Sequence, residues 1–171
     1  MESYNVRGMR GFKKRCEFMQ WLKDRSKTVD LTILVDTHCH LPREAKQWQK
    51  LWSHDKDSSF WSLGTKNRKG VSILLNPSLK DRAKILRVDT DSNGRYVKII
   101  LEIGNLKYRI LGVYAPNESC DRINFIRNLN SILIDQYDAE TIIGGDHNIA
   151  LNDDLDRICL LYTSDAADDD R

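Results

Sequence analysis

Residues 141–148 read Thr-Ile-Ile-Gly-Gly-Asp-His-Asn, a short apolar run that is β-branched and ends at two glycines. This pattern predicts a buried strand whose carboxyl end presents Asp146 and Asn148 in a cleft. The two glycines allow a sharp turn and a close approach of the backbone to a ligand. One polar group can hold a water while the other binds a phosphate oxygen or a metal-bound oxygen. The stretch therefore predicts a polar site at the end of a strand.

The rest of the chain predicts helices and strands in mixed order. Helices are expected over residues 12–27, 44–52 and 120–137, and strands over 29–35, 71–75, 95–103, 106–114 and 141–145. The turn at Gly104 and Asn105 joins two of these strands, so an antiparallel hairpin is expected there. Because one strand pair is antiparallel and helices intervene elsewhere, the sequence favours a mixed α/β sandwich over uniform βαβ alternation.

Apolar spacing predicts which side chains pack inside. The first predicted helix repeats apolar residues at intervals of three and four, which is typical of a buried helix face. The residues of this face are Phe12, Cys16, Met19 and Leu22. Three tryptophans, Trp48, Trp52 and Trp61, are interpreted as packing residues and not as groups that stack on bases.

Composition limits the classes of protein. The chain has 171 residues, 40% hydrophobic and 30% charged, which predicts one soluble α/β domain. It has no apolar run of membrane-spanning length and no visible secretory signal. The four cysteines include no C-x-x-C pair, so we expect reduced thiols in an intracellular protein.

Charge is unevenly distributed along the chain. The formal net charge is +2, but residues 159–171 carry four aspartates and one arginine, leaving 26 basic and 21 acidic residues elsewhere. A modestly basic body is compatible with nucleic acid and equally with an ordinary solvated surface.

Polar side chains fall at the ends of the expected strands, where rigid scaffolds present functional groups. They are Asn5, Asp36, Tyr114, Asn117, and the pair Asp146 and Asn148. Two carboxylates can hold a hard cation such as Mg²⁺, while amides and a phenol can bind phosphate oxygens. The chain has no glycine-rich phosphate loop followed by lysine, so nucleotide-driven transfer is not indicated. Phosphoester hydrolysis by a metal ion and an activated water fits these groups better.

Asp36, His38 and His40 allow a different interpretation. On an extended strand the three side chains would point to one side, as a metal-binding pair with a carboxylate. This resembles the opening strand of TatD-like and other amidohydrolase-type metal hydrolases. Such barrels need further histidines on later strands, and here only His54 and His147 remain.

Seven short motifs occur in an order that matches a known family. They are Asn5-Val6-Arg7-Gly8-Met9, Val35-Asp36-Thr37-His38, Gly64-Thr65-Lys66-Asn67-Arg68-Lys69-Gly70-Val71, Gly94-Arg95-Tyr96, Tyr114-Ala115-Pro116-Asn117, Gly144-Gly145-Asp146-His147-Asn148 and Leu155-Asp156-Arg157. Over about residues 3–158 the chain resembles the endonuclease/exonuclease/phosphatase superfamily. More closely, it resembles the apurinic-type endonuclease domain of non-LTR (LINE-type) retrotransposons. The resemblance implies a DNase I-like, mixed two-sheet α/β sandwich that nicks DNA with Mg²⁺ or Mn²⁺.

The resemblance also implies roles for individual residues. Asp146 would orient and help deprotonate the attacking water, Asn148 would bind water, phosphate or metal, and Tyr114 would touch the scissile phosphate. Asp36 and Asn5 would lie at the metal. Phosphate or DNA contacts are expected from Asn117, Arg7, Lys66, Arg68 and Lys69. The implied partners are the target-site duplex and the reverse transcriptase domain of the same element, and the implied location is the nucleus.

The sequence departs from the family pattern in three places. Asp36 occupies the position of the family's metal-binding glutamate, and His147 replaces a phenylalanine. The family's later aspartate and Asp-His pair have no counterpart, because no histidine follows His147. Residues 159–171 do not resemble the family and read like translated adapter sequence or a disordered acidic tail.

These departures lead us to expect an incomplete domain over residues 1–158 that nicks DNA poorly. Two other functions stay open. The first alternative is a DNA- or protein-binding remnant without catalysis. The second is a phosphatase of the same superfamily that acts on small phosphoesters.

Overall fold

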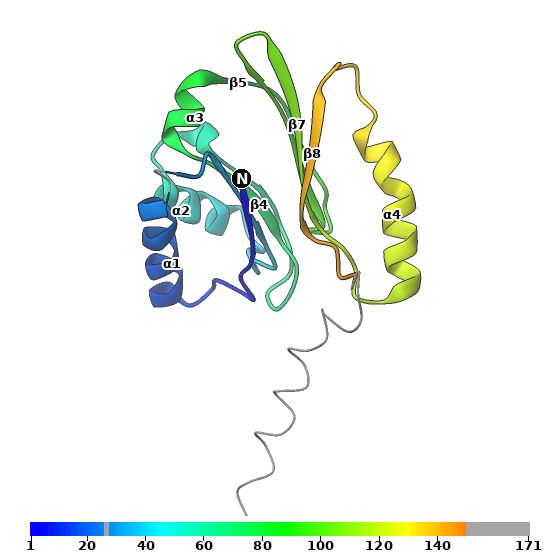
Figure 1. Cartoon of the computed structure of the whole chain (residues 1–171). Coiled ribbons are helices and arrows are strands. Elements are labelled where there is room, and N and C mark those ends of the chain that lie inside the picture. The colour runs from blue at the N-terminus through cyan, green and yellow to red at the C-terminus, as the bar shows by residue number, and fades with distance from the viewer. Residues whose placement is uncertain (26–27, 150–171) are drawn as a thin grey trace, which may run out of the picture.

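Two four-stranded sheets pack face to face in the computed structural model, which describes residues 1–25 and 28–149 (Figure 1). The first sheet has, in spatial order, β1 (Glu2–Asn5), β2 (Leu31–Val35), β4 (Val71–Leu75) and β3 (Ser59–Ser62). The second has β5 (Ala83–Thr90), β6 (Tyr96–Ile103), β7 (Leu106–Tyr114) and β8 (Glu140–Asp146). The mixed two-sheet α/β sandwich expected from the sequence is confirmed. The predicted tail at 159–171 and the Asp156-Arg157 motif lie outside the described residues.

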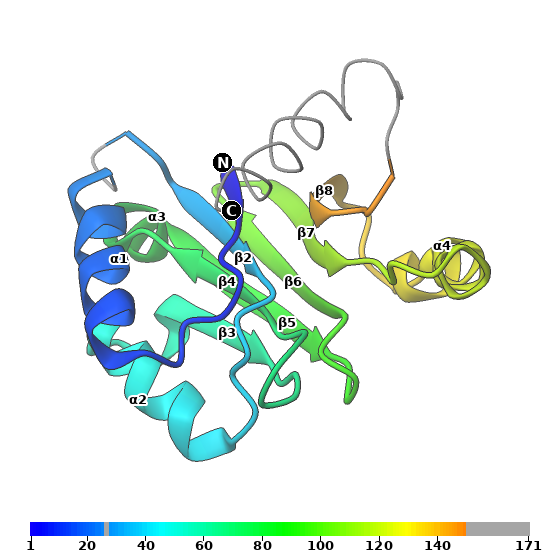
Figure 2. The same ribbon diagram turned by 90° about the horizontal axis from the view of Figure 1, so that it is seen from below.

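Helices cover the outer sides of the sandwich (Figures 1 and 2). On the side of the first sheet lie α1 (Phe12–Arg25), α2 (Pro42–Trp52), the short 3₁₀ helix η1 (Lys56–Ser58) and α3 (Pro77–Arg82). On the other side, α4 (Ser119–Leu133) lies beside the second sheet. Within the described residues, no helix has both the length and the apolar character needed to cross a membrane.

Strand direction brings several carboxyl ends to one edge of the sandwich. β1 runs parallel to β2, and Asn5 lies beside Val35. β7 runs parallel to β8, and Tyr114 lies beside Asp146. The predicted hairpin of β6 and β7 is confirmed as antiparallel. Because β1 also contacts β8 across the sandwich, the ends of both parallel pairs meet.

The central strands of the first sheet are buried on both faces. Ile33 and Ile73 point into the space between the sheets, where they pack with residues of β6 and β7. Leu34 points the other way and packs with Trp48 of α2. A strand covered on both faces has no polar alternation, which explains why the sequence signal here is a continuous apolar run.

The three tryptophans pack inside, as the sequence predicted. Trp48 and Trp52 are buried. The indole N–H of Trp52 donates to the Leu75 carbonyl at 2.9 Å. Trp61 is half-buried, with its ring edge-on to Trp48 at a centroid distance of 5.7 Å.

The buried face of α1 differs from the prediction. Met19 and Leu22 are buried as expected, but Phe12 at the first position of the helix is 69% exposed. Arg15 is buried instead, with its guanidinium carbon 4.8 Å from the Trp48 ring centroid. Its Nη1 donates to two backbone carbonyls of the preceding loop at 2.8 and 3.0 Å. The guanidinium lies inside because Nη1 bonds to these two carbonyls and the group stacks on an aromatic ring, although Nε has no hydrogen-bond partner within the described residues.

Five elements had no residue range predicted from the sequence: β1, η1, β3, α3 and β5. The Asn76-Pro77 pair begins α3 directly after the predicted strand 71–75, since the Asn76 side chain accepts a bond from Ser78 N at 2.9 Å. β3 has four residues, too few for a clear period. β5 is largely half-buried or exposed and carries a register shift between Ile85 and Arg87, which breaks its alternation.

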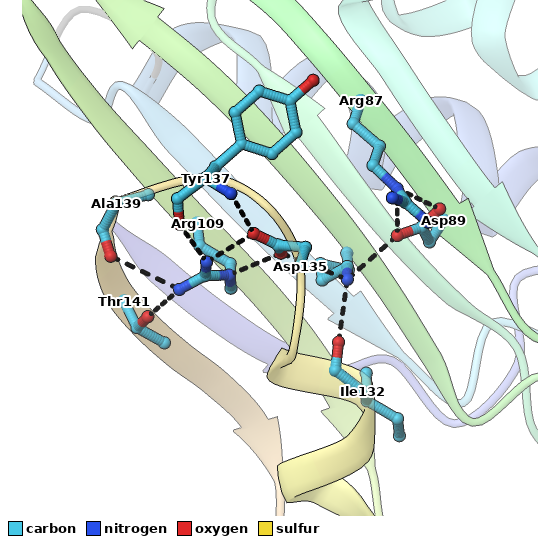
Figure 3. A network of polar contacts seen from close by, with 9 residues as sticks. Arg87, Asp89, Arg109, Ile132, Asp135, Tyr137, Ala139 and Thr141 are labelled. Carbon is cyan, nitrogen blue, oxygen red and sulfur yellow. Dashed lines mark hydrogen bonds and ion pairs between the residues drawn. The ribbon is translucent and has the colours of Figure 1, made fainter.

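A buried ionic network fixes the connection from α4 to β8 (Figure 3). The helix ends at Leu133, earlier than predicted, and Asp135 then accepts hydrogen bonds from Arg109 at 2.6 and 2.8 Å. Lys98 lies 3.4 Å from the same carboxylate. The hydrogen bonds from Arg109 hold the pKa of Asp135 well below its usual range. The network therefore ties the loop before β8 to the middle of the second sheet.

Replacing Asp135 with alanine should lower the free energy of unfolding by about 3–5 kcal/mol, because it leaves the buried Arg109 without its partner. The Asp135 side chain is 0% exposed. Since its pKa is depressed in the folded protein, this stabilisation is present above the unfolded carboxyl pKa of about 4 and is lost as the pH falls further. Urea denaturation at pH 7 and pH 3 measures both effects.

The matched control is Asp30→Ala, which removes an exposed ion pair with Arg82. The Asp30 side chain is 62% exposed, so this change should cost less than about 1 kcal/mol. Equal losses in the two variants would contradict the structural role given to the network.

Candidate active site

Two glycines near the end of β8 let Asp146 approach β7 closely. Gly145 has φ +133°, and an added Cβ there would lie 2.0 Å from the Val113 carbonyl oxygen. A Cβ on Gly144 would lie 2.9 Å from the Ile33 side chain of the opposite sheet. The Gly-Gly pair is therefore required by close backbone and core packing, and it places Asp146 next to Tyr114.

Asp146 is oriented by two donors from different parts of the chain. The Asn5 amide donates from Nδ2 to one carboxylate oxygen at 2.8 Å. The backbone N–H of Asn148 donates to the other oxygen at 2.9 Å. The Asn5 Oδ1 accepts from the Arg7 backbone N–H at 3.1 Å, which fixes the amide orientation. The carboxylate is thus held where a bound water could be oriented and deprotonated.

Asn148 connects the end of β8 to the end of β7. It has φ +50°, and its Nδ2 donates to the Ala115 carbonyl at 2.7 Å. The Ala115 N–H donates in turn to the Asp146 carbonyl at 2.8 Å. Since Nδ2 is used in this way, the Asn148 Oδ1 is the atom left to accept a bond from water or to face a cation.

Asp36 directly follows β2 and turns out of the strand with φ +57°. Its Oδ1 accepts a hydrogen bond from the Lys69 backbone N–H at 2.8 Å. The Nε2 of His38 lies 3.2 Å from the same oxygen. The loop after β3 and the end of β2 therefore meet at this carboxylate.

The alternative interpretation, an extended strand through Asp36, His38 and His40, is wrong. Both Asp36 and His38 have positive φ, so the chain turns directly after Val35. His40 lies apart from this turn, with its Nδ1 2.9 Å from the Glu44 carboxylate of α2. The two histidines thus contact different carboxylates, and the geometry gives no support to an H-x-H metal pair.

Tyr114 lies between the two carboxylates. Burial is the largest cause that raises the pKa of the Tyr114 hydroxyl, and the negative charges of Asp36 and Asp146 raise this pKa further. The Arg95 guanidinium, 5.3 Å from the ring centroid, acts in the opposite direction. The phenol therefore keeps its proton at neutral pH and can donate to a phosphate oxygen.

Two cavities open beside these groups. A cavity of about 630 Å³ is lined by Asn5, Asp146 and Asn148, together with His147. A second cavity of about 260 Å³ is lined by Tyr114 and by Arg68, Lys69, Arg95 and Asn117, among others. Asp146 and Asn148 thus face the first cavity, and Tyr114 faces the second.

The predicted site residues gather in part. Asn5, Asp36, Tyr114, Asp146 and Asn148 come together, and Arg68, Lys69 and Asn117 line the second cavity.

Two other residues that were predicted to contact phosphate or DNA are less closely associated with these groups. Arg7 meets the site through its backbone N–H. The exposed Lys66 contacts Arg10 through its carbonyl.

Sequence reasoning assigned no role to Arg95 or to the Asp36–His38 contact. Its place in the motif Gly94-Arg95-Tyr96 is the one signal that the sequence offers for Arg95.

The donor set fits a hard, partly hydrated cation. It consists of carboxylate and amide oxygens, which Mg²⁺ and Mn²⁺ prefer over softer sites. The part of the chain that the structure describes has no cluster of three or more His, Cys, Asp or Glu side chains that could hold a metal ion. Since Asn5 Oδ1 is engaged by Arg7, Asp36 is the group best suited to bind a cation, with waters completing the shell.

Solved structures share this fold. The TDP2 structure from D. rerio, complexed with a single strand DNA product, matches with a TM-score of 0.60 and 18% identity over 92% of this chain and 63% of that chain. An endonuclease/exonuclease/phosphatase family protein from Bacteroides thetaiotaomicron matches with a TM-score of 0.61 and 11% identity, over 85% and 62% of the two chains.

Beta toxin from Staphylococcus aureus matches with a TM-score of 0.56 and 12% identity, over 88% and 66%. No family model matches the sequence. The fold is therefore the mixed two-sheet arrangement of endonuclease/exonuclease/phosphatase and DNase I-like structures, and this chain spans less than two thirds of each.

Replacing Gly145 with alanine should lower the free energy of unfolding by more than about 2 kcal/mol, because strain at positive φ adds to the overlap with Val113. Gly104→Ala is the matched control. It has φ +59° and nothing within 4 Å of the added Cβ, so strain alone should cost about 1 kcal/mol. Urea denaturation of both variants tests this, and an equal or smaller loss for Gly145→Ala would rule out the close approach.

Proposed function

We propose that this chain carries the core of a metal-dependent phosphodiesterase that nicks DNA, of the kind found in LINE-type retrotransposons. The observation that supports this proposal most is the hydrogen bond of 2.8 Å between Asn5 and Asp146. It joins two polar groups 141 residues apart at the strand ends where Tyr114 and Asp36 also lie. The order of the sequence motifs implied a reaction centre made of these groups, and the fold supports this proposal.

Each of these side chains has a role in the proposed hydrolysis. Asp146, held by Asn5 and the Asn148 N–H, orients a water and accepts its proton as the water oxygen attacks phosphorus. Tyr114 donates to a non-bridging oxygen of the scissile phosphate, where charge develops. The bond from phosphorus to the 3′ oxygen then breaks. A hard divalent cation, when bound at Asp36, would polarise the phosphoryl group and offset charge on that leaving oxygen.

DNA contacts are proposed for the basic residues. Lys69, Arg68 and Lys66 lie in the loop between β3 and β4, while Arg7 follows β1 and Asn117 precedes α4. Contacts from such groups to phosphates position a strand without reading its sequence. The reverse transcriptase domain of the same element as a partner, and a nuclear location, also belong to this proposal and rest on the motif resemblance alone.

A nicking assay tests the proposed activity. Supercoiled plasmid with Mg²⁺ should be converted to the open circle, and Asp146→Ala should slow this by about 10²–10⁴-fold, because the general base is lost. Asp30→Ala, which changes an exposed carboxylate of an ion pair, should leave the rate unchanged. Equal rates for the wild type and Asp146→Ala would refute the role of Asp146. DNA binding without any nicking would support the alternative of an inactive remnant.

The metal requirement gives a separate prediction. EDTA should abolish nicking, and either Mg²⁺ or Mn²⁺ should restore it. Asp36→Ala should raise the Mg²⁺ concentration for half-maximal nicking by about 10–100-fold, because it removes the carboxylate assigned to the cation. Metal titrations of nicking by both proteins measure this shift, and full activity in EDTA would contradict the assignment.

A further inference from the structure

We infer that the cavity beyond Tyr114 is a subsite for a second phosphate, so that the substrate is an oligonucleotide strand and not a small phosphomonoester. The inference rests on the proposed function, because it takes the site around Asp146 to hold the scissile phosphate. The cavity has a volume of about 260 Å³ and lies between the β3–β4 loop and the segment that joins β7 to α4.

Three cations line this cavity without a counterion. Arg68, Lys69 and Arg95 form no ion pair within residues 1–25 and 28–149, whereas Arg87 and Arg109 each pair with an aspartate. Burial lowers the pKa of Lys69, and the charges of Arg95 and Arg68 lower it further. Positive charge is thus concentrated in a partly enclosed space, which an anion would neutralise.

Acidic groups also face this region, but none of them forms an ion pair with the three cations within the described residues. Glu118 and Asp121 line the same cavity, and the charge of Asp121 acts on Arg95. Asp91 acts electrostatically on Lys69 and Arg95, but its carboxylate accepts bonds from Ser62 and from backbone N–H groups. The cavity is therefore lined by three cations and two carboxylates, and the cations, which are in excess, are the groups able to bind phosphate.

Arg95 is held in a fixed orientation. Its Nη1 donates to the Tyr114 and Ala115 carbonyls, both at 3.2 Å. Its backbone N–H donates to Asp91 at 2.7 Å. Neither its Nε nor its Nη2 has a hydrogen-bond partner in the described part of the chain. These two donors of the planar guanidinium suit the oxygens of a phosphate.

Backbone packing brings Arg95 to the other two cations. Gly94 has φ +69°, and an added Cβ would lie 2.7 Å from the Gly64 Cα. The Gly94 carbonyl accepts from the Gly70 N–H at 3.1 Å. The turn before β6 is therefore fixed against the loop that carries Arg68 and Lys69, and this contact brings Arg95 to the same cavity.

The subsite adjoins the proposed reaction centre through two residues. The Tyr114 ring lies against Arg95, while its hydroxyl is influenced by Asp36 and Asp146. Lys69 donates its backbone N–H to Asp36, and its side chain lines the cavity. Neighbouring phosphates of one strand can therefore occupy the reaction centre and the adjoining cavity, whereas a small phosphomonoester fills only one of them.

Calorimetric titration of the whole chain with thymidine 3′,5′-bisphosphate and with the two thymidine monophosphates tests the subsite. The bisphosphate should bind at least about tenfold more tightly than either monophosphate, because each charged hydrogen bond contributes measurably. Arg95→Gln and Lys69→Gln should each reduce this preference to about threefold or less. Arg87→Gln is the matched control, since it removes an arginine of a different cavity, and it should retain the preference.

Each outcome decides the inference. Arg95→Gln also removes bonds to two carbonyls, so Lys69→Gln, whose side chain makes no such bonds, provides the variant that leaves the fold undisturbed. Equal binding of bisphosphate and monophosphates overturns the subsite. So does a preference that survives in Lys69→Gln, or one lost equally in Arg87→Gln. Plasmid nicking without the preference refutes the subsite alone, and the preference without nicking refutes the phosphodiesterase alone.

Discussion

The site depends on one hydrogen bond across the sandwich, from the Asn5 amide to the Asp146 carboxylate. Asn5 ends β1 in the first sheet, and Asp146 ends β8 in the second. Their contact requires both parallel strand pairs to end at the same edge, and it requires the sheets to pack closely there. The position of Tyr114 beside Asp146 follows from the same arrangement.

The sequence predicted the parts of the fold whose signals are local. The buried strands β2 and β4 read as apolar runs, and the β6–β7 hairpin followed from its turn. The short β3 and the irregular β5 were not visible, because their pairing depends on neighbours distant in sequence. Phe12, which was expected inside, is exposed, and Arg15 is buried, since stacking on Trp48 and bonds to loop carbonyls outweigh the polarity of its side chain.

The sequence likewise predicted the site residues whose signals are local, and it missed those whose positions depend on contacts between distant segments. Strand-end residues such as Asp36, Tyr114 and Asp146 stand where a sequence motif can locate them. A sequence motif does not locate Arg95 in this way, because Arg95 lies beside Lys69 only where two loops touch through Gly94 and Gly64. The contact of His38 with Asp36 depends on positive φ at both residues, which the H-x-H spacing does not reveal.

Close packing at Gly144 couples the interior to the reaction centre. This glycine rests against Ile33, a core residue of the other sheet, two positions before Asp146. A change in the volume of that core side chain would move the end of β8 and with it the carboxylate. The interior and the reaction centre therefore cannot evolve independently, and libraries that vary the core for stability would also vary catalysis.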